Sequence, residues 1–152
     1  MFRGSSAITM DNKGRITIPT RYRDPLQEGC GGEVICTTDL NQPCLLLYPM
    51  SEWESVEKRL RGLSDMVPTE RMFKRRVLGN AAELEIDKSG RLLIPPILRQ
   101  FAQLEKQVTL VGQLNKFEIW SQQTWEAQMQ ADMELINSAD FELTERLQDF
   151  TL

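Results

Sequence analysis

The chain has 152 residues, of which 41% are hydrophobic and 26% charged, with a net charge of −4 and no histidine. This composition is ordinary for a globular protein, and no apolar run approaches the ~20 residues that a membrane-spanning helix needs. The start, Met1–Gly4, lacks the apolar stretch of a signal peptide, so we expect a cytoplasmic protein. Because histidine and the P-loop, GxGxxG and HExxH patterns are absent, we expect no enzyme, no small-molecule substrate and no cofactor.

The three cysteines, Cys30, Cys36 and Cys44, are odd in number and show no CxxC spacing. They therefore indicate neither a disulfide framework nor a metal site. We expect them to be buried or partly exposed thiols.

The charge is distributed unevenly along the chain. Residues 126–152 contain seven acids and one base, a balance of −6, which leaves 17 bases and 15 acids in residues 1–125, a balance of +2. A local basic patch binds phosphate whatever the total charge, so the charge pattern permits DNA binding without demonstrating it. The acidic C-terminal segment should then lie away from any DNA-binding face.

An internal repeat organises the chain. Residues 11–19 read Asp-Asn-Lys-Gly-Arg-Ile-Thr-Ile-Pro, and residues 87–95 read Asp-Lys-Ser-Gly-Arg-Leu-Leu-Ile-Pro, at an offset of 76. At the same offset Arg23 matches Arg99. Downstream, Leu45–Tyr48 matches Phe117–Trp120 after short deletions. A chance match would not continue in order through later strands, so we interpret the chain as a tandem duplication.

The first copy predicts alternating short strands and helices. Its patterns favour strands over 7–10 and 15–18, a short helix over 20–26 after Pro19, and strands near 34–37 and 44–48. Ser51–Glu54 has the spacing of a capping box, and Trp53, Val56, Leu60 and Leu63 then follow helical periodicity, which indicates a closing helix with a packing face.

A break at 64–68 precedes a predicted helix over 69–78 that carries Arg71, Lys74, Arg75 and Arg76. This basic run is either a solvated helix face or a contact with DNA or an acidic neighbouring subunit.

The second copy repeats the plan of the first. Strands are expected over 84–86, 91–94, 108–111 and 117–120, with a helix over 96–101 and a closing helix marked by Trp125, Met129, Met133 and Ile136. We therefore predict a β-rich α+β protein with repeats at 1–63 and 81–137, a linker and basic helix at 64–80, and an acidic tail at 138–152.

The repeated Asp-x-x-Gly-Arg turn carries the candidate chemistry. Glycine at Gly14 and Gly90 permits a tight reversal with positive φ, and the Asp11 and Asp87 carboxylates can accept hydrogen bonds from turn amides, so these four residues are expected to structure the loops. Arginine at the fifth position offers a planar set of donors suited to phosphate or guanine. On residue chemistry alone, Arg15 and Arg91 either contact DNA or only pair with the aspartates of their own turns.

The sequence resembles the MraZ family over nearly its whole length. The residues that carry the resemblance are Met1–Gly4, Asp11–Arg15, Pro19–Arg23, Cys44–Pro49, Asp87–Pro95 and Val111–Phe117. The resemblance implies two AbrB-like swapped-hairpin β-barrel units with flanking helices and a pseudo-twofold within one chain.

The same resemblance implies a nucleoid-associated homo-oligomeric ring that binds short direct repeats in double-stranded promoter DNA. The ring size is open, with an octamer among the candidates. Such proteins act mainly as repressors of the division and cell-wall gene cluster, including their own operon. Arg15 and Arg91 would contact DNA, and Lys13, Arg3 and Lys88 are further candidate phosphate contacts. Arg21, Arg23 and Arg99 would contact DNA or support the loop or a subunit contact.

Two alternatives from another class stay open. The chain could be an oligomeric scaffold in which the arginines form salt bridges between subunits. It could also be an AbrB-like antitoxin that binds a partner through its acidic tail, although such proteins usually carry one repeat per chain.

Overall fold

The computed structural model describes residues 1–150 and 152 and divides them into two compact units, Met1–Gln122 and Gln123–Leu152. All eight strands found in the described residues belong to the first unit. None of the helices in this part of the chain is long and apolar enough to cross a membrane.

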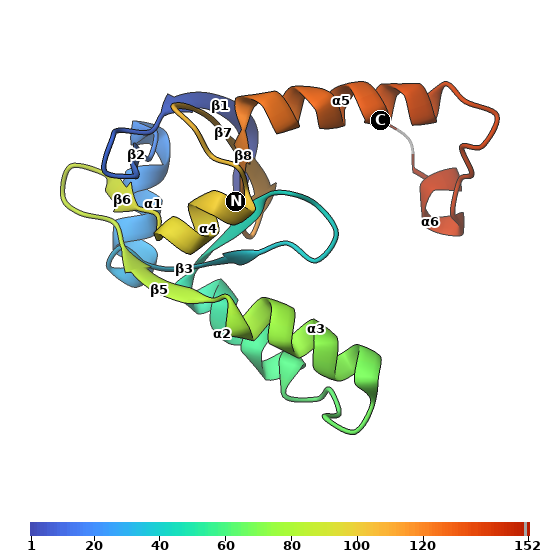
Figure 1. Ribbon diagram of the computed structural model, residues 1–152, viewed down its shortest axis with the longest axis horizontal. Helices are drawn as coiled ribbons and strands as arrows, with labels where there is room; N and C mark the ends of the chain where they lie inside the picture. The colour runs from blue at the N-terminus through green and yellow to red at the C-terminus, as the bar shows by residue number, and fades with distance from the viewer. Residues whose placement is uncertain (151) are drawn as a thin grey trace. The chain divides into compact units, whose positions relative to one another are not determined.

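The first unit contains two similar series of elements separated by a helix (Figure 1). The first series is β1 (Phe2–Thr9), β2 (Arg15–Thr17), α1 (Thr20–Cys30), β3 (Glu33–Thr38), β4 (Leu45–Pro49) and α2 (Met50–Leu60). After α3 (Pro68–Gly79), the second is β5 (Ala82–Glu85), β6 (Arg91–Leu93), α4 (Pro96–Phe101), β7 (Gln107–Leu114) and β8 (Phe117–Ser121). Helices α5 (Gln122–Ile136) and α6 (Glu145–Gln148) follow.

The two series interleave in one antiparallel sheet with the strand order β1-β7-β8-β4-β3-β5. The outer strand β1 of the first series pairs with β7 of the second, and β5 of the second pairs with β3 of the first. The central pair β4–β8 also joins the two series, and β2 pairs with β6 in a separate ladder. This exchange confirms the β-rich α+β class and gives the pseudo-twofold order. Ladders among the described residues leave β1 and β5 as sheet edges, so the closure of the predicted β-barrel is not shown.

The core forms where the two short strands meet. Ile16 and Leu92 are cross-strand partners and are fully buried, as are Ile18 and Ile94 two residues later. Side chains alternate across a strand, so the arginines that precede these apolar residues point to the other face of the ladder. Burial of a side chain of this size stabilises the fold by about 1.5–3 kcal/mol, which fixes the register of both loops.

Several elements are longer than the local patterns predicted. Strand β1 begins at Phe2 because all eight of its residues pair with β7. Helix α1 passes through Pro25 and ends at Cys30, and Gly31, with a φ of 62°, forms the left-handed cap that follows it. The capping-box prediction at Ser51 was wrong: α2 begins at Met50 after Pro49, with no side-chain cap hydrogen bond.

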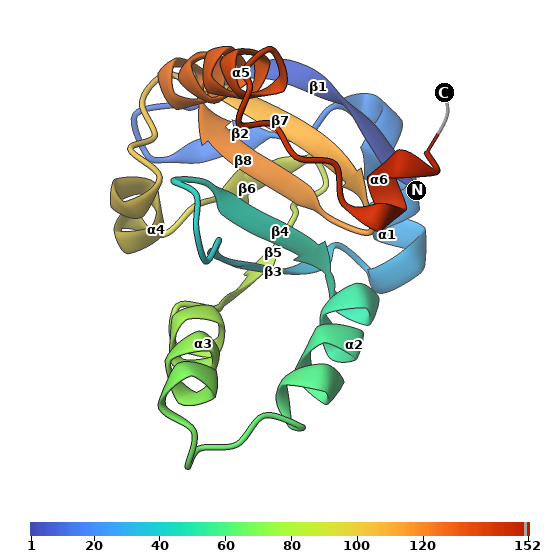
Figure 2. The same ribbon diagram turned by 90° about the vertical axis from the view of Figure 1, so that its right-hand side faces the viewer.

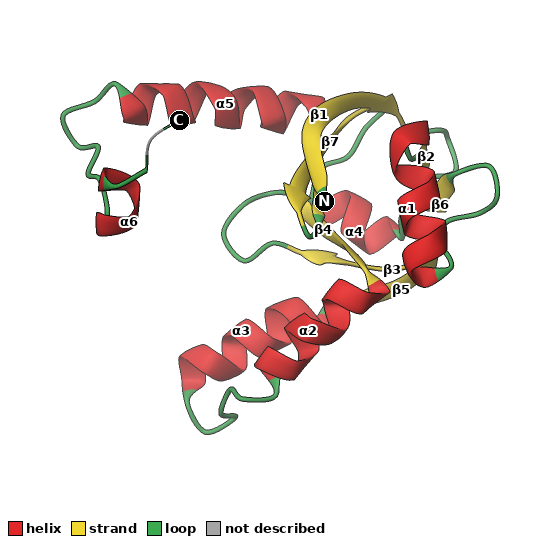
Figure 3. Ribbon diagram, turned by 180° about the vertical axis from the view of Figure 1, so that it is seen from behind, coloured by secondary structure: helices red, strands yellow, loops and turns green. Residues whose placement is uncertain are grey.

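Helices α2 and α3 extend from the β3–β4 end of the sheet (Figures 2 and 3). Trp53 and Leu60 of α2 and Val77 of α3 are buried in a second, smaller apolar cluster, which confirms the packing face predicted for the first closing helix. In α5, by contrast, Met129, Met133 and Ile136 are exposed, so the equivalent face is not covered in this structure.

The cysteines are free thiols, as predicted. Cys36 and Cys44 are buried, and burial raises the pKa of the Cys36 thiol to about 12. These side chains therefore behave as small apolar groups of the core.

Candidate nucleic-acid interface

The first Asp-x-x-Gly-Arg loop is held by the side chain of its aspartate. The backbone amides of Lys13 and Arg15 both donate to Asp11 Oδ1 at 2.9 Å, and Arg15 Nε donates to Asp11 Oδ2 at 2.8 Å. Gly14 has a φ of 88°, and its amide donates to the Asp11 carbonyl at 3.0 Å. Asp11 therefore fixes both the turn and the direction of the arginine.

The second loop repeats this geometry. Asp87 Oδ1 accepts hydrogen bonds from the amides of Ser89 and Arg91 at 2.9 Å, and Asp87 Oδ2 accepts one from Arg91 Nε at 3.1 Å. Gly90 has a φ of 80°. The loop-structuring geometry predicted for the aspartates and glycines is thus present in both copies.

The β2–β6 ladder brings the two loops to the same edge of the first unit (Figures 1 and 3). The amide of Ile18 donates to the Gly90 carbonyl at 2.7 Å, and the amide of Ile94 donates to the Gly14 carbonyl at 3.0 Å. Each strand leaving one loop is therefore bonded to the glycine of the other loop, so the loops are coupled as one rigid pair.

Both arginines keep donors available for a ligand. The Arg15 and Arg91 side chains are 33% and 45% exposed, and each ion pair uses only Nε. In the described residues, the terminal amino groups of these guanidiniums have no hydrogen-bond partner. The pairing of each arginine with the aspartate of its own turn, which was one of the two roles considered from the sequence, is present. The same pairing orients the terminal amino groups of the guanidinium, which remain available as donors.

Each loop is covered by an arginine from the other repeat. Arg99 of α4 lies against Gly14, where an added Cβ would be 2.5 Å from Arg99 Cζ, and Arg23 of α1 lies against Gly90. Arg23 Nε donates to the Ile18 carbonyl at 2.8 Å. Arg99 Nε is the buried side-chain nitrogen of the described chain that has no hydrogen-bond partner. Glycine at both positions thus permits positive φ and leaves room for the covering arginine side chains, which a Cβ would displace.

The other predicted cations differ in position. Lys13 and Lys88 are exposed on the two loops, so each loop presents a lysine in addition to its arginine. Arg3 lies in β1 opposite Gln113, toward the other end of that strand from the loop, so it is not brought to Asp11. Arg21 Nη2 donates to Ser6 Oγ at 3.0 Å and lies over the Tyr22 ring, which indicates a supporting role.

The electrostatics of the loops keep both aspartates ionised. The pKa of Asp11 is lowered to about 2, chiefly because its carboxylate accepts a hydrogen bond from the Arg15 amide. The pKa of Asp87 is also lowered, chiefly by the Arg91 amide. At neutral pH each loop therefore contains a permanent carboxylate–guanidinium pair.

Sequence reasoning did not assign the covering role to Arg23 and Arg99. The signal was present in their match across the repeat, but a local pattern does not show that each one crosses to the opposite loop. Within the described residues no group of three or more His, Cys, Asp or Glu side chains could hold a metal ion.

Comparison with known proteins shows the family of the chain. The family model described as "MraZ protein, putative antitoxin-like" matches twice, over residues 1–76 and 77–149. Proteins named Transcriptional regulator MraZ from Pseudoalteromonas atlantica, Colwellia psychrerythraea and Klebsiella pneumoniae are 57%, 56% and 52% identical to this chain. Each of these alignments covers 100% of both chains.

Proposed function

Because the chain belongs to the MraZ family, we propose that it is a sequence-specific DNA-binding transcriptional regulator and has no catalytic role. The observation that carries the proposal is the coupled pair of loops, each with an arginine held by an aspartate and with terminal donors left for a ligand. Arginine in this form can bind a phosphate or the O6 and N7 atoms of guanine with two hydrogen bonds.

In this proposal Arg15 and Arg91 contact DNA, and Lys13 and Lys88 neutralise phosphates beside them. Arg3 is a weaker candidate, because it lies toward the far end of β1. The target is double-stranded promoter DNA with short direct repeats upstream of the division and cell-wall cluster, including the protein's own operon. Binding there represses transcription, and the protein works in the cytoplasm at the nucleoid.

A homo-oligomeric ring completes the proposed mechanism. Two loops neutralise few phosphates, and affinity for DNA rises with the number neutralised. Copies of the loop pair in a ring would engage successive direct repeats, and linked sites of suitable geometry can raise avidity by roughly 10²–10⁴.

A salt-resolved titration on labelled DNA from upstream of the protein's operon tests the proposal. We expect the wild type to prefer this DNA over a scrambled sequence, and Arg15→Ala/Arg91→Ala to lose that preference while keeping its oligomeric mass. Lys58→Ala/Arg61→Ala is the matched control, because it removes two exposed charges from the α2 region and should leave binding unchanged. Equal binding by wild type and the loop variant would contradict the proposal.

The scaffold and antitoxin alternatives make different demands on the same residues. A scaffold needs the arginines to pair between subunits, whereas the Nε atoms of Arg15 and Arg91 already pair within their own loops. If the loop variant loses mass but keeps DNA binding, the scaffold alternative takes its place. If the wild type shows no DNA preference and its acidic tail binds a partner protein, the antitoxin alternative replaces the proposed function.

A further inference from the structure

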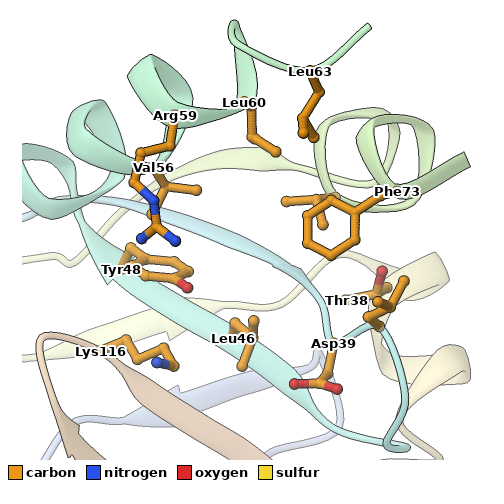
Figure 4. A pocket seen from close by; sticks show the side chains of 12 residues that line it. Thr38, Asp39, Leu46, Tyr48, Val56, Arg59, Leu60, Leu63, Phe73 and Lys116 are labelled. Carbon is orange, nitrogen blue, oxygen red and sulfur yellow. The ribbon is translucent and has the colours of Figure 1, made fainter. Parts of the chain in front are cut away.

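A pocket of about 510 Å³ lies within the first unit, between helices α2 and α3 and the strands β3 and β4 (Figure 4). Its volume is within the range of about 300–1,000 Å³ that is typical of binding pockets. The walls are mainly apolar and come from both helices, from the segment that follows α2 and from β4: Leu46, Tyr48, Val56, Leu60, Leu63 and Phe73. The loops described above contribute none of these residues.

Two cations line the same pocket. Arg59 reaches from α2 toward Tyr48, and Lys116 Nζ lies over the Tyr48 ring at 5.8 Å from its centroid (Figure 4). Neither side chain has an ion pair with another described residue. The pocket's carboxylate, Asp39, accepts hydrogen bonds from the backbone amides of Asn41 and Gln42 at 2.9 and 3.0 Å. The pocket therefore has an excess of positive charge beside an apolar wall.

The end of the chain has the complementary composition. Residues 138–152 contain four acids and one base, and apolar side chains stand between the acids. Phe141, Leu143, Leu147 and Phe150 are all exposed. Among its described residues this segment has no buried side chain and only the one-turn helix α6. These exposed apolar side chains, which alternate with acids, complement a pocket that has an apolar wall and an excess of positive charge.

We propose that the C-terminal segment of a second copy of this chain, residues 140–150, docks in the α2–α3 pocket. The apolar side chains of this segment cover the pocket wall that includes Leu60 and Phe73, and its carboxylates pair with Arg59 and Lys116. The inference deepens the homo-oligomer part of the proposed function and rests on it. Each chain supplies one pocket and one tail, so the contact is heterologous, and a heterologous contact closes into a ring when the rotation permits.

The test uses a labelled peptide of residues 138–152 and the full chain carrying Phe141→Ser, Leu143→Ser, Leu147→Ser and Phe150→Ser. This tail variant keeps the pocket but removes the competing apolar side chains. We expect the peptide to bind it, and a peptide of the same composition in scrambled order to bind at least tenfold more weakly. Adding Arg59→Glu/Lys116→Glu should weaken binding at least tenfold and reduce its salt dependence.

Matched controls separate this contact from general charge attraction. Lys58→Glu/Arg61→Glu makes the same charge change outside the pocket and should alter the affinity by less than threefold. A peptide with Glu142→Lys and Glu145→Lys should regain affinity for the charge-reversed pocket. Equal binding of native and scrambled peptides, or no loss on Arg59→Glu/Lys116→Glu in a protein with unchanged circular dichroism, would overturn the proposal.

Oligomeric mass and DNA binding distinguish this inference from the proposed function. The tail variant should have a lower mass than wild type, with its loops intact. If it keeps both the wild-type mass and the wild-type DNA affinity, tail docking is wrong while the regulator function stands. If Arg15→Ala/Arg91→Ala binds DNA as wild type does, the proposed function fails whatever the peptide result.

Discussion

The two Asp-x-x-Gly-Arg loops have the same backbone hydrogen bonds but differ in how well their covering arginines are satisfied. Over Gly90, Arg23 donates its Nε to the Ile18 carbonyl at 2.8 Å. Over Gly14, the Nε of Arg99 is buried and has no hydrogen-bond partner in the described chain. The duplicated sequence has therefore produced one covering arginine whose Nε is hydrogen-bonded and one whose Nε is buried without a partner in the described chain.

The loops have the same formal charge but carry their lysines at different positions, Lys13 in the first loop and Lys88 in the second. Lys13 stands in the first loop where Ser89 stands in the second, and Arg15 is less exposed than Arg91. The lysine at the third position is thus in the first loop, whose covering arginine, Arg99, has a buried Nε without a hydrogen-bond partner among the described residues. Duplication has preserved the turn, which local residues determine, while the supporting contacts of each copy have diverged.

Replacing the loop glycines should give the largest effects on stability. A side chain at positive φ costs about 1–3 kcal/mol in either loop. Gly90→Ala must also displace Arg23 from its hydrogen bond, which adds about 1 kcal/mol. We expect urea denaturation to show a greater loss of unfolding free energy for Gly90→Ala than for Gly14→Ala. Equal losses would show that the Arg23 bond does not stabilise the second loop.

Replacing the covering arginines should give a smaller and asymmetric effect. Arg23→Met keeps most of the aliphatic side chain but leaves the Ile18 carbonyl without its donor, so we expect a loss of about 1 kcal/mol. Arg99→Met removes a buried nitrogen that has no partner among the described residues, and the unfolding free energy should change by less than about 0.5 kcal/mol. Thermal and urea denaturation of both variants measure the difference, and an equal cost for the two would refute the asymmetry.

Exchanging the third loop residue tests how the position of the lysine affects DNA binding. Lys13→Ser should reduce the slope of log affinity against log salt by about 0.9 for each phosphate that the lysine neutralises, and Ser89→Lys should increase it similarly. Lys13→Ser/Ser89→Lys is the control, because it keeps composition and net charge. A double variant that binds with the slope of Lys13→Ser alone would show that only the first loop touches phosphate.

The smallest effect concerns pH. Because the pKa of Asp11 is lowered from 3.8 to about 2, its contribution to stability is present above pH 3.8 and is lost as the pH falls toward 2. The largest cause is the Arg15 backbone amide, so Arg15→Ala should leave the pKa below 3.8. The pKa of Asp11 is measured from its carboxyl chemical shift, followed by NMR as the pH is changed. A return of this pKa to 3.8 in Arg15→Ala would show that the guanidinium is the main cause of the lowered value. The pKa of Asp87, also lowered, should respond to Arg91→Ala in the same way.

The family, the duplication and the two loops could be predicted from the sequence. Residues 11–15 and 87–91 form their turns through hydrogen bonds that span two to four residues, so a short pattern contains the information. The positions of most strands followed from the same local patterns. Strand β1 did not, because its first residues are ordered by pairing with β7, about a hundred residues away.

The way in which the repeats combine is a property of the tertiary structure. The exchange of β1 and β5, the crossing of Arg23 and Arg99 to opposite loops, and the pocket between α2 and α3 all depend on contacts between distant residues. Such contacts form only when the apolar faces of both repeats are buried together, and a single repeat does not specify its partner. Local residues are therefore enough to shape each loop, whereas packing between the repeats placed the two loops side by side.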